Sequence, residues 1–445
     1  MSRPADEGAV RPPRSPHEHW RRNRIAITLG TAMVFLGFSL VMPFLPFYVR
    51  TLGVEEMGDV ALWSGILLTV TPLLAAILGP IWGRLADRIG MKIMVTRVIF
   101  AMTVHWGLMY FATSIWHVLA LRIFLGLFSG FGVLSVALVT QGAPRDRIGG
   151  AIGSLKATQI LCTAVGPFIG GMLAEWIGIR HTFLLTFVLC TGAFVFVLFL
   201  YRDVPRTIPP AAVEEVVVPQ EGPVAAGVRA IVTGGDHALR DRRPTIREIL
   251  ALPMFLSLLP FLFLLNLVER TFTLSVPLAM QSFLGEGGSL EATTGMVVSA
   301  GAFAGALSAW LLGRLVTRWS PLTLLSWSLV SGLVTILPMA LCREVLPFAL
   351  LRVLLGLASG GAATLTYTFG GQFIPDSVRA SGYSLLSACA MLGGSMGPIV
   401  CSGLTAIDLR ANFIAGGLIY LVLVVLVMRL IGRTAERGRP FASMP

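Results

Sequence analysis

Residues 79 to 92 read Gly79-Pro80-Ile81-Trp82-Gly83-Arg84-Leu85-Ala86-Asp87-Arg88-Ile89-Gly90-Met91-Lys92 and lie between two long apolar runs, 60–82 and 93–112. Each run is long enough to cross a bilayer, because about 20 apolar residues span the hydrocarbon core. We interpret the stretch as a short polar turn in which Gly83 and Gly90 allow sharp changes of direction. A positive-inside signal alone needs no acid. The order Gly-x-x-x-Asp-Arg-x-Gly-x-Lys therefore predicts a more specific role.

The composition indicates a multi-spanning membrane protein. The chain has 445 residues, of which 55% are hydrophobic and 13% are charged, whereas soluble domains have about 25% charged residues. The formal charge of +11 comes largely from bases in the connections between apolar runs, as membrane topology requires. We therefore expect the lipid bilayer, and no nucleic acid, as a partner. The five cysteines form no Cys-x-x-Cys pair and have no histidine nearby, so we expect no metal site.

Apolar segments of spanning length recur twelve times, and this even number predicts that both termini lie on one side. The bases concentrate on that side, which identifies it as the cytoplasm. We therefore expect a multi-pass protein of the plasma (inner) membrane with both termini cytoplasmic. The expected spans cover residues 25–49, 60–82, 93–112, 118–140, 149–176, 182–201, 253–281, 294–312, 322–341, 345–369, 380–404 and 412–431.

One long polar connection divides these spans into two sets of six. It is rich in proline and has too little apolar content for a core, so we expect a flexible tether and no embedded regulatory domain. The predicted organisation is a cytoplasmic tail (1–24), a six-helix bundle (25–201), a cytoplasmic linker (202–250), a second six-helix bundle (251–431) and a cytoplasmic tail (432–445).

The two halves repeat each other in sequence. Residues 121–130 match 351–360 with Leu, Arg, Leu, Gly, Leu, Ser and Gly in place, and Arg122 faces Arg352 at an offset of 352 − 122 = 230. Gly166-Pro167 corresponds to Gly397-Pro398 at an offset that is one residue larger, 397 − 166 = 231. This pattern predicts an all-α membrane fold made of two pseudo-symmetric six-helix bundles, with a midplane site between them.

The charged stretch resembles the signature between the second and third helices of the major facilitator superfamily. That resemblance implies twelve transmembrane helices and a cytoplasmic latch that contacts neighbouring helix ends in the outward-facing state. Position 91 is Met where the family carries a base. The latch residues implied are Gly83, Asp87, Arg88, Gly90 and Lys92.

A second motif lies in the expected fifth span. Gly166, Pro167, Gly170 and Gly171 form Gly-Pro-x-x-Gly-Gly, which resembles the signature of the proton-coupled drug antiporters within the superfamily. Small residues at four-residue spacing also serve ordinary helix packing. Residues 38–49 and 63–65 add a resemblance to bacterial twelve-span multidrug efflux antiporters. The resemblance implies a monomeric exporter of small amphipathic molecules, driven by the proton gradient and needing no cofactor.

An acid inside a membrane is expensive and indicates function, and elimination leaves Glu269 near the middle of a span. Asn266, Arg270 and Thr273 form a polar stripe with it. Glu269 is therefore a candidate for proton coupling, and the alternative is a structural ion pair with a base on another span, such as Arg352. By resemblance, Arg122 of the fourth span also takes part in coupling. The expected first span contains no acid.

A cavity for apolar substrates needs aromatic side chains and a few polar groups, although each candidate taken singly also fits bundle packing. An importer or uniporter on the same scaffold remains an alternative function. An enzyme is not expected, because no nucleophile–base or metal-ligand constellation occurs in the spans. The candidate cavity residues are Phe35, Phe38, Phe128, Phe131, Gln159, Asn266, Arg270 and Tyr367.

Overall fold

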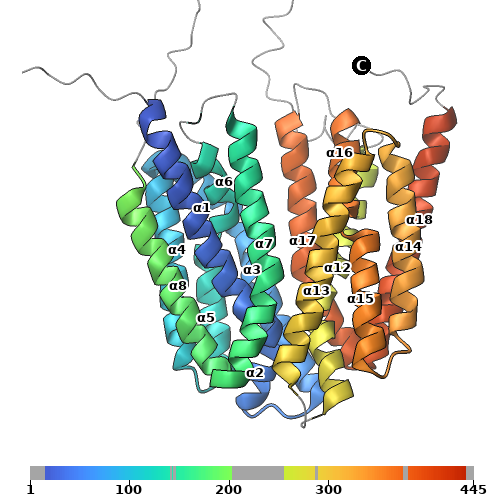
Figure 1. Cartoon of the computed structure of the whole chain (residues 1–445), viewed down its shortest axis with the longest axis horizontal. Coiled ribbons are helices and arrows are strands. Elements are labelled where there is room, and N and C mark those ends of the chain that lie inside the picture. The colour runs from blue at the N-terminus through green and yellow to red at the C-terminus, as the bar shows by residue number, and fades with distance from the viewer. Residues whose placement is uncertain are drawn as a thin grey trace, which may run out of the picture.

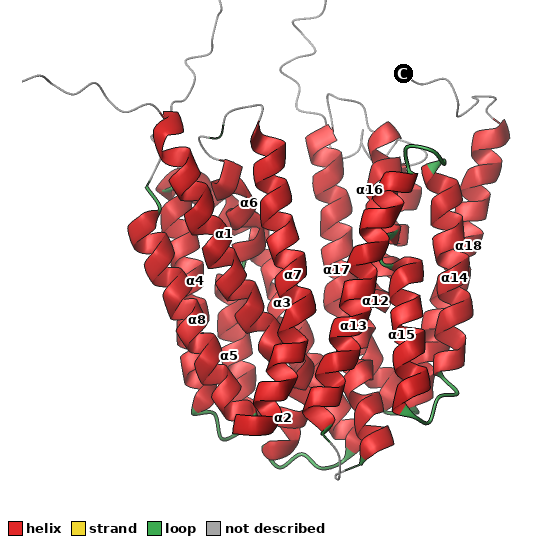
Figure 2. Ribbon diagram, viewed as in Figure 1, coloured by secondary structure: helices red, strands yellow, loops and turns green. Residues whose placement is uncertain are grey.

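The computed structural model describes residues 16–140, 143, 147–202, 255–285, 289–373 and 379–436. Within these ranges all regular structure is helical (Figure 2). The terminal tails up to residue 15 and from residue 437, and residues 203–254 with most of the expected linker, lie outside the described residues.

The described residues of the first half form eight α-helices and one short 3-10 helix. They are α1 (Pro16–Val41), η1 (Met42–Phe44), α2 (Leu45–Thr51), α3 (Met57–Ile89), α4 (Met91–Tyr110), α5 (Ile115–Phe128), α6 (Phe131–Thr140), α7 (Ile148–Ile177) and α8 (Ile179–Leu200). The second half forms α12 (Phe255–Leu284), α13 (Leu290–Leu315), α14 (Pro321–Met339), α15 (Val345–Ser359), α16 (Ala362–Phe373), α17 (Arg379–Thr405) and α18 (Leu409–Glu436).

The two halves stand side by side, with the start of α1 and the end of α18 at the same edge (Figure 1). Among the described residues, eleven helices are long and apolar enough to cross a membrane, and the remaining expected span is divided between α5 and α6. The predicted all-α membrane fold of two six-span bundles is confirmed.

Two of the expected spans are interrupted. The sequence predicts continuous helices over 118–140 and 345–369, but α5 gives way to α6 at Gly130, with φ of 126°, and α15 gives way to α16 at Gly360. The offset is again 360 − 130 = 230. Glycine tolerates a positive φ that other residues avoid, so Gly130 ends one helix and begins another without leaving the bundle.

A helix broken inside a membrane must find new donors for its freed carbonyls. The indole Nε1 of Trp82 donates to the Leu127 carbonyl at 2.8 Å, and Arg97 donates to the Phe128 carbonyl at 3.4 Å. In the second half the Ser328 hydroxyl donates to the Ala358 carbonyl at 2.5 Å. Neighbouring helices therefore compensate both breaks.

The polar turn predicted over residues 79–92 is wrong in its extent. Helix α3 continues to Ile89, and Gly90 (φ 102°, ψ 147°) both ends α3 and precedes the first residue of α4. Gly83 therefore lies inside a helix and makes no sharp turn. Residues such as Leu85 and Ala86 favour helix, and they carry α3 past its apolar part.

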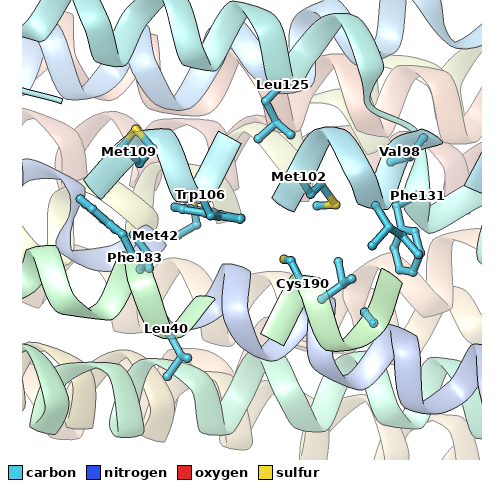
Figure 3. Packing of buried hydrophobic residues seen from close by; sticks show 14 of the residues in the cluster. Leu40, Met42, Val98, Met102, Trp106, Met109, Leu125, Phe131, Phe183 and Cys190 are labelled. Carbon is cyan, nitrogen blue, oxygen red and sulfur yellow. The ribbon is translucent and has the colours of Figure 1, made fainter. Parts of the chain in front are cut away.

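The core of the first half packs aromatic residues such as Trp106, Phe131 and Phe183 among aliphatic and methionine side chains (Figure 3). The Tyr48 ring lies 4.7 Å from that of Phe183 in an edge-to-face contact, and its hydroxyl donates to the Ala112 carbonyl at 3.0 Å. Trp106 lies 6.1 Å from Phe183. These contacts fix the bend at η1 and α2 against α4 and α8.

Two glycines of the antiporter-type motif pack α7 against α1. A Cβ added at Gly166 would collide with Ser39, and one added at Gly170 would collide with the backbone of Leu40. The small-residue face predicted on this helix therefore lets two helix backbones approach closely.

We expect Gly170→Val to lower the unfolding temperature of the detergent-purified protein, because its side chain meets the Leu40 backbone. Overpacking of this kind costs about 1–3 kcal/mol. Gly153→Val is the matched control on the same helix, since nothing lies within 4 Å of a Cβ there. Equal unfolding temperatures for the two variants in a thermal melt would contradict the close α1–α7 contact.

Candidate functional site between the two halves

The halves meet through α7 with α13 and through α3 with α17. A Cβ on Gly171 would collide with the Glu291 carbonyl, and one on Gly295 would collide with the Pro167 carbonyl. The amide of Phe168 also donates to the Ser299 hydroxyl at 2.9 Å across this contact. Helix backbones therefore touch at the crossing of α7 and α13.

The crossing of α3 and α17 is equally close. A Cβ on Gly65 would lie 2.5 Å from the Ser402 hydroxyl and 2.8 Å from the Pro398 carbonyl. Gly65 is near the start of α3, and Gly171 is near the end of α7. Both contacts therefore lie toward the end of the bundle opposite the start of α1 and the end of α18 (Figure 1).

The residues of the antiporter-type motif contact two different helices. Gly166 and Gly170 face α1, whereas Pro167 and Gly171 face α13 of the other half. One turn of α7 therefore ties the packing inside the first half to the contact between the halves.

Glu269 lies on α12 beside two residues of other helices. Its charge acts on Arg352 of α15 and on Tyr420 of α18, although no direct ion pair joins Glu269 and Arg352 within the described structure. The Arg352 guanidinium carbon lies 4.6 Å from the centre of the Phe272 ring, and the Tyr420 hydroxyl bonds to Ser359. The basic partner considered from sequence is thus near the acid.

Glu269 is exposed on α12, and this helix also contacts η1 and α3 of the first half. Helix α12 packs against α13, α16, α17 and α18, so little of it is left for lipid. Asn266 and Thr273 lie on the same side as Glu269 by helical geometry. Arg270 is also exposed, and its stem packs against Gly394 and Gly397 of α17. The predicted polar stripe therefore lies on a helix that contacts both halves.

Arg122 is the counterpart of Arg352 in the first half. It is 1% exposed, and its guanidinium donates to the Met42 sulfur at 3.6 Å. The Thr71 hydroxyl donates to its backbone carbonyl at 2.9 Å, and the guanidinium lies 6.0 Å from the Trp106 ring. No carboxylate pairs with it among the described residues, so this candidate for coupling has no acid beside it.

The two copies differ at equivalent positions on their first helices. Gly166 contacts Ser39 in the first half, and Gly397 contacts Arg270 in the second half. The two glycines are 397 − 166 = 231 residues apart, and so are their two partners, because 270 − 39 = 231. By the same offset, Glu269 corresponds to Phe38, because 269 − 38 = 231. Phe38 packs edge-to-face on Trp106 at 6.4 Å.

The aromatic candidates are distributed over several contacts. Phe35 lies 6.4 Å from Phe131, which brings α1 and α6 together. Phe128 stacks on Trp82 at 6.4 Å and so belongs to the packing of α3 against α5. Tyr367 bonds to Ser387 of α17. Of these, the structure places Phe35 and Phe131 in direct contact and leaves Phe128 and Tyr367 in separate clusters.

The latch residues lie around the junction of α3 and α4. Arg88 is exposed in the last turn of α3, and Lys92 is partly buried in the first turn of α4. The surroundings of Gly83 and the side chain of Asp87 lie outside what the structure describes. The latch therefore remains a prediction.

Comparison with known proteins decides the family. The model of the Major Facilitator Superfamily matches residues 27–344 and 271–444. This chain belongs to the major facilitator superfamily. The multi-drug resistance efflux pump PmrA homolog of Lactococcus lactis is 30% identical over 408 residues, covering 92% of this chain and 94% of the relative. Multidrug resistance protein MdtG of Klebsiella pneumoniae is 30% identical over 428 residues, covering 95% and 97%.

Solved structures of superfamily transporters share the fold. A bacterial homolog of the human lysosomal transporter Spinster, in an inward-facing and occupied conformation, has a TM-score of 0.76 at 14% identity and covers 97% of this chain and 100% of its own. The nucleoside transporter NupG has a TM-score of 0.68 at 12% identity and covers 92% and 99%. The chain is therefore a multi-pass membrane transporter of the superfamily.

Sequence reasoning missed Lys156. This residue of α7 is exposed, and its ammonium group donates to the Gln159 side-chain oxygen at 3.1 Å. Gln159, a cavity candidate, is itself buried. Lys156 lies within the expected span 149–176, and a base inside a span is as visible in the sequence as an acid.

The charge of Glu269 acts on Arg352, so we expect Glu269→Gln and Arg352→Gln to be coupled in stability. The double variant should lose less than the sum of the two single losses, by about 1 kcal/mol, because each single variant leaves one charge uncompensated. Thermal unfolding of the purified transporter measures this. Glu269→Gln with Arg410→Gln is the control pair, and equal coupling in both cycles would contradict the contact.

Proposed function

We propose that this superfamily transporter exports small amphipathic molecules in exchange for protons, by alternating access of its two halves. Both efflux relatives described above are named for multidrug resistance. The observation that carries the proposal is the contact of Pro167 and Gly171 with α13: the antiporter-type motif lies where the two halves meet.

The contact supplies a pivot for the proposed motion. At the crossing of α7 with α13 the backbones touch, and at the crossing of α3 with α17 only the small Ser402 side chain and the Pro398 carbonyl lie against Gly65. Such surfaces can part or slide without disturbing the interior of either bundle. We place both termini on the cytoplasmic side of the plasma membrane. The end of the bundle at which the two halves touch then faces outward. Asp87 and Arg88 then act as the latch that holds the opposite, outward-facing state.

Glu269 is the proposed proton carrier. In a dry environment a lone carboxylate favours its neutral, protonated form, whereas a nearby cation and water favour the ionised form. Arg352 supplies the cation, and the exposure of Glu269 supplies access to water. Opening and closing of the two halves would change that access and so load and release the proton. Arg122, buried without an acid, is the second coupling candidate.

Alternating access predicts that a cross-link at the inter-half contact stops transport. In a cysteine-free background, Gly65→Cys with Ser402→Cys should form a disulfide on oxidation, because these positions are in contact. Transport by proteoliposomes should fall at least about tenfold and return on reduction. Gly53→Cys with Ser402→Cys is the control, since Gly53 has no neighbour within 4 Å of an added Cβ. Full transport by the cross-linked protein would refute the rocking of the halves.

Proton antiport predicts that an inside-acidic pH gradient drives uptake of a fluorescent amphipathic probe into inverted vesicles. Glu269→Gln should lower gradient-driven uptake at least about tenfold, a size typical of coupling between two ligands. Glu175→Gln is the matched control, an exposed acid at the end of α7. Unchanged uptake by Glu269→Gln would remove that residue from coupling, and probe movement in the opposite direction would favour the importer.

A further inference from the structure

In the described part of the chain, two exposed bases lie on helices that contact the other half. Lys156 of α7 and Arg270 of α12 are both exposed, and neither has a carboxylate partner in the described part of the chain. Glu269 is the acid next to Arg270 on α12, and Arg352 stands beside it. Lys156 and Arg270 therefore give this region a net positive charge.

Helical geometry places Lys156 on the side of α7 that faces the other half. It precedes Pro167 by 167 − 156 = 11 residues, which is about three turns, so the two residues lie on nearly the same face. Pro167 touches α13 of the other half. Lys156 is therefore about 16 Å from that contact, toward the end where the helices are not joined.

Arg270 lies deeper than Lys156. It packs against Gly397, and the next residue, Pro398, touches Gly65 of the first half. Pro398 is the repeat counterpart of Pro167, because 398 − 167 = 231. Arg270 therefore lies at the depth of the inter-half contact, at the floor of the proposed route, while Lys156 lies nearer its entrance.

We infer that the transported molecules are amphiphiles that carry an anionic group, such as a carboxylate or a sulfonate. This inference rests on the proposed function and names the substrate class of the same site. Lys156 attracts the anion at the entrance, and Arg270 binds it at the floor with its planar set of donors. Partly desolvated bases without a carboxylate favour such a ligand, and they repel a cation of the same size.

A matched pair of probes tests the substrate class. Dansyl-6-aminohexanoate and dansylcadaverine share a fluorophore and an alkyl chain and differ in the sign of their terminal charge. Binding to the full-length purified protein is followed by dansyl fluorescence, and transport is followed in proteoliposomes. We expect the carboxylate probe to bind at least about tenfold more tightly than the amine, the factor that one charge-assisted hydrogen bond supplies.

Variants assign the preference to the two bases. Arg270→Gln should weaken binding of the carboxylate probe at least about tenfold, and Lys156→Gln should weaken it less and reduce its dependence on salt. Neither should weaken binding of the amine probe. Arg270→Lys and Lys156→Arg keep the charge and should retain the preference, which controls for misfolding. Arg410→Gln, a base at the start of α18 away from the route, should match the wild type.

The outcomes separate the inference from the function. Tighter binding of the carboxylate without any transport would support the substrate class and count against the transporter proposal. Transport of the amine as fast as the carboxylate, with carboxylate binding unchanged in Lys156→Gln and Arg270→Gln, would leave transport in place and overturn the substrate class. Failure of the wild-type protein to bind the carboxylate probe would also overturn it.

Discussion

Two helix backbones can touch across an interface only where no side chain stands between them, and glycine supplies that condition where the halves meet. Gly171 of α7 and Gly295 of α13 each lie against backbone of the other half, and Gly65 of α3 lies against α17. In lipid there is little hydrophobic drive between helices, so close packing contributes much of the association. The position of these residues at one end determines where the two bundles are joined and where they are separate.

The repeat explains the architecture, and the departures from it locate the chemistry. Each half has an arginine at the same point, Arg122 or Arg352, and a broken helix eight residues later. Around this shared frame the first helix of each half has diverged. Phe38 and Ser39 in one copy correspond to Glu269 and Arg270 in the other. One bundle therefore presents an aromatic and a small residue where the other presents an acid and a base.

Hydropathy and the internal offset predicted the helical class, the two bundles and the small-residue face of α7, because these follow from segment length and residue size alone. The same reasoning placed a turn over residues 79–92, whereas α3 runs to Ile89. Charge ended the apolar pattern there, but charge does not end a helix. The break at Gly130 was also missed, because apolar residues continue on both sides and only the backbone angle reveals it. Lys156 is visible in the sequence as a base inside an expected span, but the side of α7 on which it lies follows only from the helices around α7.

The contrast between the two arginines bears on where a proton can be handled. Arg122 is enclosed by Met42, Trp106 and the segment around Thr71, and no carboxylate pairs with it among the described residues; the nearby His105 is held by its Nδ1, which lies 3.0 Å from the Leu121 carbonyl. Arg352 has Glu269 within electrostatic reach, and that acid is exposed. A coupling group must meet water in one state and lose it in another. That requirement favours the proposed role of Glu269, because this acid is exposed on a helix that contacts both halves, whereas Arg122 is buried inside one bundle.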